Sequence, residues 1–130
     1  MGEIAHAALR LRNPVCGDLL PLNVRAVADT RTTHLVIPRH VAIQLGLEVL
    51  EQREVALPDG TKRSVDYVGP IEVGFANRSC FVGALVLGNE VLLGAIPMED
   101  MDLVVNPQLR QVTVNPDSPN MASGIVKIAA

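Results

Sequence analysis

The chain has 130 residues, which is enough for one compact domain and excludes a large two-domain enzyme. Hydrophobic residues make up 48% of the sequence and charged residues 19%, a composition typical of a folded globular domain rather than a disordered chain. The net charge is -3, and the aromatic residues are limited to Tyr67, Phe75 and Phe81, so the chain offers neither a basic stripe for phosphates nor stacking surfaces for bases. We therefore expect an aliphatic core and no nucleic-acid partner.

The cysteine content and the first residues argue against an exported protein. Cys16 and Cys80 can form at most one disulfide, which is far from the dense framework of a small secreted domain, so we expect free thiols. The chain does not start with basic residues followed by an apolar run, and its longest apolar stretch, residues 91–98, is far shorter than the roughly 20 residues of a membrane-spanning helix. We expect a cytoplasmic protein with no membrane partner.

Short runs of Val, Ile and Leu are separated by Gly, Pro, Asn and Asp, a pattern that predicts many brief strands and few helices. In chain order, we expect strands at residues 4–11, 23–29, 33–37, 51–57, 61–68, 71–75, 79–87, 103–105 and 111–114. A short helix is expected to open at Pro38 and to end near Leu45, because proline fits the first turn of a helix and Gly46 suits its end. The predicted fold class is therefore all-β with one or two short helices.

Two further prolines mark expected boundaries of strands and helices. We expect Gly69-Pro70 to break the chain between two strands, and Pro97 to open a second short helix whose first turn holds Glu99 and Asp100. Carboxylates at that place would suit the positive end of the helix dipole. An aliphatic run leads into Ile-Pro and a helix at both Pro38 and Pro97, which hints at two similar half-domains.

Two local patterns position polar residues that could carry chemistry. Alternation over residues 23–29 predicts a strand that ends on the carboxylate of Asp29. Pro58, Asp59 and Gly60 separate two strand-like runs and predict a β-hairpin, because proline sets the first φ of a turn and glycine accepts the left-handed conformation. Taken alone, Asp29 is most simply interpreted as a strand-terminal aspartate that caps its own turn.

In their order along the chain, these features resemble the retropepsin-like aspartic proteases, in particular the small bacterial and archaeal relatives of the retroviral enzymes. The resemblance covers residues 23–114. It is carried by Val24-Arg25-Ala26-Val27-Ala28-Asp29-Thr30, by Leu35-Val36-Ile37-Pro38 before a helix, by a hairpin where the family has its flap, and by Val91-Leu92-Leu93-Gly94 before a second helix.

The resemblance implies a fold and a domain organisation. The fold would be a retropepsin-like closed β-barrel, also called the acid protease fold, with one lobe per chain. Residues 1–114 would form the protease domain, and residues 115–130 would form a linker and a C-terminal tail. In the retroviral relatives the terminal strands pair with those of the partner chain, and the sequence of this tail leaves that geometry open.

The resemblance also implies a role for each matching residue. Asp29 would be the catalytic carboxylate, and Thr30 would hydrogen-bond across a twofold axis. Leu93 and Gly94 would be structural residues at the active site, where Gly94 lets the second motif approach the Asp29 loop closely. Residues 57–64 would form the flap over the substrate, with contacts from Leu57, Pro58, Asp59, Gly60 and Thr61.

Peptide hydrolysis by this route, as in known aspartic proteases, needs two carboxyl groups that share one proton. The chain supplies one Asp-Thr strand end, so the second carboxyl is expected from a second copy, in a homodimer whose two Asp29 side chains meet at the axis. The leading function is therefore an aspartic endopeptidase that cleaves peptides or unfolded proteins. We expect no cofactor and no metal, since His6, His34 and His40 do not form a metal-ligand motif.

The sequence departs from the family after Thr30, where the family has glycine and this chain has Arg31. A guanidinium about 5 Å from a carboxylate stabilises the ionised form by roughly 3 kcal/mol at an effective dielectric of about 20, so two such arginines would leave the pair without its general acid. Alternatively, Arg31 points along the cleft and binds an acidic residue of the substrate. Two other functions stay open: a catalytically inactive homodimer that binds peptide or serves as an interaction module, and a structural β-domain.

Overall fold

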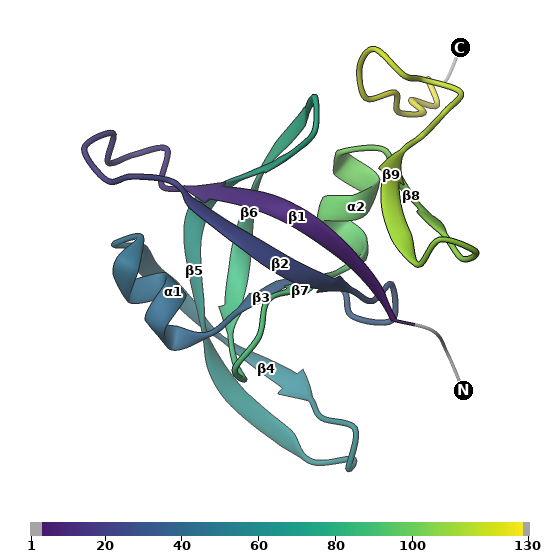
Figure 1. The fold of residues 1–130 in the computed structure, drawn as a ribbon. Coiled ribbons are helices and arrows are strands. Elements are labelled where there is room, and N and C mark those ends of the chain that lie inside the picture. Colours follow the sequence, from purple (N-terminus) through teal and green to yellow (C-terminus); the bar gives the residue numbers. More distant parts are fainter. Residues whose placement is uncertain (1–3, 129–130) are drawn as a thin grey trace.

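The computed structural model describes residues 4–128, which contain nine strands and two short helices (Figure 1). In chain order they are β1 (Ala5–Arg12), β2 (Leu22–Ala28), β3 (Leu35–Ile37), α1 (Arg39–Gln44), β4 (Glu48–Ala56), β5 (Lys62–Phe75), β6 (Arg78–Val86), β7 (Leu92–Leu93), α2 (Ala95–Asp100), β8 (Leu103–Asn106) and β9 (Gln111–Val114). The predicted all-β class with short helices is confirmed, and α1 lies between Pro38 and Gly46 as expected.

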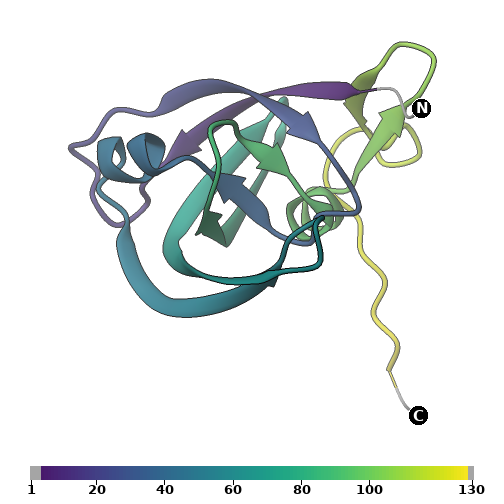
Figure 2. The same cartoon turned by 90° about the horizontal axis from the view of Figure 1, so that it is seen from below.

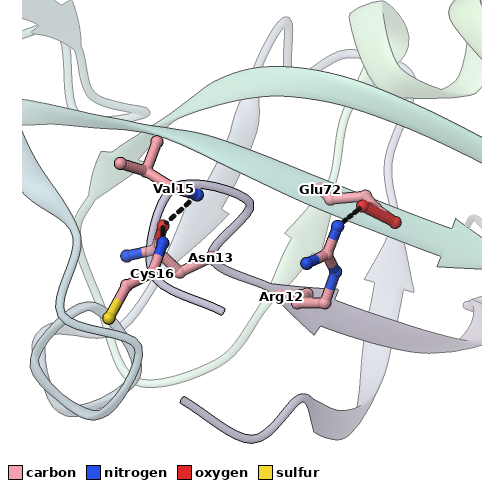
Figure 3. A network of polar contacts seen from close by, with 5 residues as sticks. All are labelled: Arg12, Asn13, Val15, Cys16 and Glu72. Atoms are coloured by element: carbon pink, nitrogen blue, oxygen red, sulfur yellow. Dashed lines mark hydrogen bonds and ion pairs between the residues drawn. The ribbon is translucent and has the colours of Figure 1, made fainter. Parts of the chain in front are cut away.

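Six of the strands close into a barrel, because β5 pairs with β6 on one side and with β1 on the other. The order around the barrel is β5, β6, β3, β7, β2 and β1, while β4 extends the sheet beyond β5, and β9 and β8 extend it beyond β1. Figure 2 shows the strands curving around a common centre, with α1 and α2 on opposite sides. Arg12 of β1 and Glu72 of β5 form an ion pair across the closing junction (Figure 3).

Aliphatic side chains fill the barrel, as the composition predicts. Burial of a side chain of this size contributes about 1.5–3 kcal/mol relative to leaving it in water, so the core is the main source of stability. Phe81 contributes little, since it is 62% exposed. The largest fully buried side chains are Leu9, Leu11, Leu35, Ile37, Leu45, Ile71, Leu93, Met101, Val68, Val73 and Pro97.

The strand β5 is longer than the sequence predicts. Gly69-Pro70 was expected to break the chain, but β5 runs through this dipeptide without interruption. The pairing between β5 and β6 shifts register between Val68 and Ile71, so the proline lies in a β-bulge, where the ladder is already irregular and a missing N–H is tolerated. Pairing with strands on both sides thus overrides the local break signal.

The second helix also differs from the prediction. It begins at Ala95 rather than at Pro97, and Pro97 lies in its first turn, where N–H groups have no helical acceptor and proline is tolerated. Glu99 and Asp100 consequently lie in the last turn of α2, so the favourable interaction expected with the positive end of the helix dipole does not occur. Neither helix within residues 4–128 is long and apolar enough to cross a membrane.

A buried asparagine fixes the loop that follows β1. Asn13 is 5% exposed, and its Nδ2 donates to the carbonyl oxygen of Leu45, at the end of α1, at 2.9 Å. Its Oδ1 accepts hydrogen bonds from the N–H groups of Val15 at 2.9 Å and Cys16 at 3.1 Å (Figure 3). One side chain therefore joins the loop after β1 to the first helix.

The chain after β9 contains no strand or helix within residues 115–128, but its first part is held against the barrel. The carboxylate of Asp102 accepts hydrogen bonds from the hydroxyl of Ser118, from the N–H of Ser123 at 3.0 Å and from Nδ2 of Asn115 at 3.2 Å. Asp102 thus fastens the start of the tail directly behind α2. The apolar side chains near the end of the tail are exposed: Ile125, Val126 and Ile128.

Candidate active site

Asp29 follows the last residue of β2 and stands on a short turn. Its N–H donates to the carbonyl oxygen of Leu93 at 3.0 Å, which continues the parallel pairing of β2 with β7. Its carbonyl oxygen accepts from the N–H of Thr32 at 3.0 Å and closes the turn. The backbone of Asp29 is therefore fixed on both sides, and its side chain remains 27% exposed at the end of the barrel.

The segment after β7 braces the same turn from the other side. The N–H groups of Ala95 and Ile96 donate to the carbonyl oxygens of Thr32 and Thr33, each at 2.8 Å. A Cβ at Gly94 would lie 2.2 Å from the carbonyl oxygen of His34 and 2.6 Å from that of Thr32, distances that no side chain can occupy. A residue other than glycine at position 94 would push α2 away from the Asp29 turn.

Arg31 binds the carboxylate of Asp29 with both its backbone and its side chain. The Oδ1 atom of Asp29 accepts from the Arg31 N–H at 3.0 Å and from its Nε at 3.1 Å, and Oδ2 accepts from Nη2 at 3.3 Å. The backbone bond is the cap of a strand-terminal aspartate on its own turn. The side-chain bonds add a bidentate ion pair, which is the strong geometry for arginine and a carboxylate.

The ion pair sets the charge of the site. The hydrogen bond from the Arg31 side chain is the largest cause that lowers the pKa of Asp29 below its ordinary value, and partial burial opposes this shift only in part. Asp29 is therefore ionised near neutral pH. The Arg31 side chain is 91% exposed, and within residues 4–128 it binds no acceptor other than Asp29.

The sequence also proposed Thr30 and the tip of the β4–β5 hairpin for the site. In the described chain, neither makes a hydrogen bond to Asp29 or Arg31. Thr30 is exposed, between these two residues. At the hairpin tip, the N–H of Leu57 donates to the carbonyl oxygen of Thr61 at 2.8 Å, and Oδ1 of Asp59 accepts from the Thr61 N–H at 2.9 Å. This tip, which also contains Pro58 and Gly60, projects from the barrel into solvent (Figure 1).

A pocket that borders His34, two residues after the Asp29 turn, was missed by sequence reasoning. It has a volume of about 480 Å³, and three exposed apolar side chains line it: Leu50, Phe81 and Ile96. The Arg53 guanidinium carbon lies 3.9 Å from the ring centroid of Tyr67, and its Nη1 lies 3.3 Å from Nε2 of His34. These residues come from five separate elements or loops, so no local pattern joins them.

Neither cysteine of the chain, nor any cluster of metal-ligating side chains in its described part, offers an alternative site. Burial raises the pKa of the Cys80 thiol to about 12, so this cysteine is a poor nucleophile at neutral pH. Cys16 is exposed, and both cysteines are free. Among the described residues, no group of three His, Cys, Asp or Glu side chains could hold a metal ion.

Comparison with known proteins tests the fold. No family model matches the sequence, and no curated protein matches it. The structure is similar to the crystal structure of the retroviral protease-like domain of Ddi1 from Leishmania major, with a TM-score of 0.55 and 12% sequence identity over 88% of this chain and 91% of that chain. At this identity the likeness concerns the fold alone. The protein therefore has the closed β-barrel of a retroviral protease-like domain, as the order of its motifs predicts.

Proposed function

We propose that this protein is an aspartic-type endopeptidase that acts as a homodimer, in which each chain supplies Asp29 as one half of the catalytic pair. The observation that carries the proposal is the position of Asp29, whose carboxylate stands at the end of β2 on a turn held by Leu93 and Gly94, within a retroviral protease-like fold. A carboxylate on a fixed strand end is pre-organised for acid–base chemistry, because little freedom is left to lose when it meets its partner.

In the proposed dimer, the two Asp29 carboxyl groups lie side by side and share one proton, since two like charges at short distance cannot both stay ionised. The ionised carboxylate takes a proton from a water molecule as the water oxygen attacks the scissile carbonyl carbon. The protonated carboxyl donates its proton to the carbonyl oxygen. The tetrahedral intermediate then collapses: the first carboxyl gives the amide nitrogen the proton that it took from water, and the C–N bond breaks to release an amine. A hydroxyl of the intermediate returns its proton to the second carboxylate as the new carboxyl group of the product forms.

Exposed apolar side chains on an outer strand support a second copy as the partner. β8 is an outer strand of the sheet, and its Val104 and Val105 are each 37% exposed. An outer strand with apolar side chains is suited to pairing with another chain. In a twofold dimer the same strand would serve on both chains, and the exposed Thr30 would face its own copy beside the axis.

An extended peptide suits the surface around Asp29. The β4–β5 hairpin projects as a lid would, and its closure over a bound peptide would exclude water from the reaction. The pocket that borders His34 would take an apolar side chain of the substrate against Leu50, Phe81 and Ile96. We therefore propose peptides and unfolded proteins as substrates, because only extended chains present their backbone to such a cleft.

Arg31 gives the proposed enzyme a resting state. While its guanidinium covers Asp29, the pair of carboxyls holds no shared proton and lacks its acid. Catalysis therefore requires that Arg31 leave at least one of the two carboxyls. Its 91% exposure means that little besides Asp29 holds the side chain, so an acidic residue of the substrate can draw it away.

A second candidate function is an inactive homodimer of the same fold that binds peptides or serves as an interaction module. The bidentate contact between Arg31 and Asp29 favours this candidate. If neither Arg31 moves, both carboxylates stay ionised and no proton is available for the scissile carbonyl.

Cleavage of a reduced, alkylated protein from about pH 4 to pH 7 tests the first proposal against the second. We expect Arg31→Gly to cleave faster than the wild type, and Asp29→Asn to be inert with or without Arg31→Gly. Asp18→Asn, which removes an exposed carboxylate from the loop after β1, should leave the rate unchanged. An inert Arg31→Gly dimer would contradict the enzyme and favour the second candidate, whereas a strictly monomeric protein would contradict both.

A further inference from the structure

A second groove lies outside the candidate active site, along β1 and β2. It has a volume of about 1260 Å³ and is bounded by β1, β2, the turn after β5 and the loop between β8 and β9. None of the residues proposed for catalysis or substrate binding lines it. Its lining includes the basic side chains of His6, Arg10 and Arg25 and the apolar side chains of Phe75 and Leu109.

The groove forms where β1 changes its neighbour. Arg10 pairs with Gly74 of β5, whereas His6 pairs with Gln111 of β9. Ala8, between them, pairs with β2 but with no strand on its other side within the described chain. The strands β5 and β9 therefore diverge at this point and form a fork in the sheet. The groove lies within this fork.

The backbone of Ala8 faces into the groove. The N–H of His6 donates to the carbonyl oxygen of Arg110 at 3.3 Å, so the peptide groups of His6 point toward β9. Peptide groups alternate in direction along a strand, so the N–H and carbonyl of Ala8, two residues later, point to the same side. A strand edge that lacks a partner can bind an extended peptide through main-chain hydrogen bonds.

The side chains around this edge are basic. Arg25 lies directly opposite Ala8 in the pairing of β1 with β2, so it stands on the same face of the sheet as Arg10. Both arginines are exposed, and neither forms an ion pair with a carboxylate of residues 4–128. No acidic residue lines the groove in this part of the chain.

The position of Arg10 depends on a glycine. A Cβ at Gly74 would lie 3.0 Å from Nη2 of Arg10, so the guanidinium lies across the backbone of β5. This places one charge at the β5 side of the fork, while Arg25 supplies another from β2. Exposed Leu109 adds an apolar wall on the third side. In a chain with a net charge of -3, this is a local concentration of positive charge.

We propose that this groove binds an extended acidic segment of a partner protein, which adds as a short strand beside Ala8 and places carboxylates against Arg10 and Arg25. The unpaired backbone edge explains why the occupant is a peptide, and the two arginines explain why it is acidic. The groove is a site for a partner rather than for hydrolysis, so this inference does not depend on whether the protein cleaves peptides.

Binding of short labelled peptides to the full chain, measured by fluorescence anisotropy at low salt, tests the proposal. The probes are an eight-residue peptide of alternating Glu and Val, its Lys-Val counterpart, and a Glu-Val peptide with alternate amides N-methylated. We expect only the unmethylated Glu-Val peptide to bind. Arg10→Gln with Arg25→Gln should weaken binding about tenfold, whereas the Lys pair at both positions should retain most of it.

A matched control uses Arg63→Gln, which removes an exposed charge from β5 outside the groove and should leave binding unchanged. Circular dichroism melts show whether each variant is folded. Four results would overturn the proposal: no binding of the Glu-Val peptide, equal binding of the N-methylated peptide, tighter binding of a single-stranded oligonucleotide than of the peptide, or a loss of dimer mass in the Arg10 and Arg25 variants. The last result would mean that the groove is a contact between copies of the chain.

Discussion

Arg31 and Asp29, two residues apart in one turn, form a bidentate ion pair, with Nε and Nη2 of the arginine 3.1 and 3.3 Å from the two carboxylate oxygens. The contact lies within a single chain, so it exists before any partner or substrate binds. It occupies the group that an aspartic protease would use for chemistry. The consequences of this pair can be measured separately from catalysis.

Removal of the guanidinium should raise the pKa of Asp29. In the wild type this pKa is lowered mainly by the hydrogen bond from the Arg31 side chain. The ion pair therefore stabilises the fold above the ordinary carboxyl pKa, and this stabilisation is lost as the pH falls through the lowered pKa. In Arg31→Gly, Asp29 should become protonated at a higher pH. Carbon NMR titration of the aspartate carboxyls measures this shift, with Arg63→Gln as the control. An unchanged Asp29 titration would contradict the ion pair.

A side chain at position 94 should destabilise the fold. In Gly94→Ala the new Cβ would overlap the carbonyl oxygens of His34 and Thr32, and overpacking of this kind costs about 1–3 kcal/mol. We expect a lower urea midpoint and faster exchange of the Ala95 and Ile96 amide protons, which bond to the Asp29 turn. Gly17→Ala is the matched control, since nothing lies within 4 Å of its Cβ position. Equal stability of the two variants would refute the proposed brace.

Loss of the buried asparagine should destabilise the protein through unmade hydrogen bonds. Asn13→Ala leaves the N–H groups of Val15 and Cys16 and the carbonyl of Leu45 without their side-chain partner. An unfolding free energy lower by about 1–3 kcal/mol is expected. Asn89→Ala, at an exposed turn, should change stability little. Urea denaturation compares the two, and similar midpoints would show that the loop after β1 does not depend on Asn13.

The start of the C-terminal tail should detach at low pH. Hydrogen bonds lower the pKa of Asp102, and the bond from the Ser118 side chain has the largest effect. The tail is therefore fully docked above the ordinary carboxyl pKa, and its docking is lost as the pH falls through the lowered pKa of Asp102. Asp102→Ala should detach residues 115–123 at neutral pH and expose them to proteases. The control is Asp117→Ala, an exposed residue of the same segment. Resistance of the Asp102→Ala tail to cleavage would contradict this anchor.

The features that sequence could predict are those set by neighbouring residues. Alternation over residues 23–29 placed Asp29 at a strand end, and Pro58, Asp59 and Gly60 marked the turn of the β4–β5 hairpin, as the structure has them. Pro38 and Gly46 delimited α1 in the same way. The strand depended on the alternation of side chains between two faces, and the turn and the helix ends depended on dihedral preferences that act within a few residues.

The features that sequence missed depend on contacts between distant segments. A proline in β5 is tolerated because β4 and β6 pair with β5 on its two sides and because the proline lies in a bulge. The residues around Gly69-Pro70 contain no signal for this pairing. The rotamer of Arg31 follows from the turn geometry around Asp29 rather than from residue type. The pocket around Tyr67 joins several strands, and its one sequence signal is Gly83, on which the aromatic ring packs.

In the proposed enzyme, two copies of the chain bring their Asp29 side chains together at a twofold axis. Disulfide trapping tests it directly: Asp29→Cys, in a chain whose exposed Cys16 is replaced by serine, is mildly oxidised and analysed without reductant. We predict a covalent dimer for Asp29→Cys and monomers for Asp18→Cys in the same background. A monomeric Asp29→Cys chain after oxidation would contradict the shared site and, with it, the proposed peptidase.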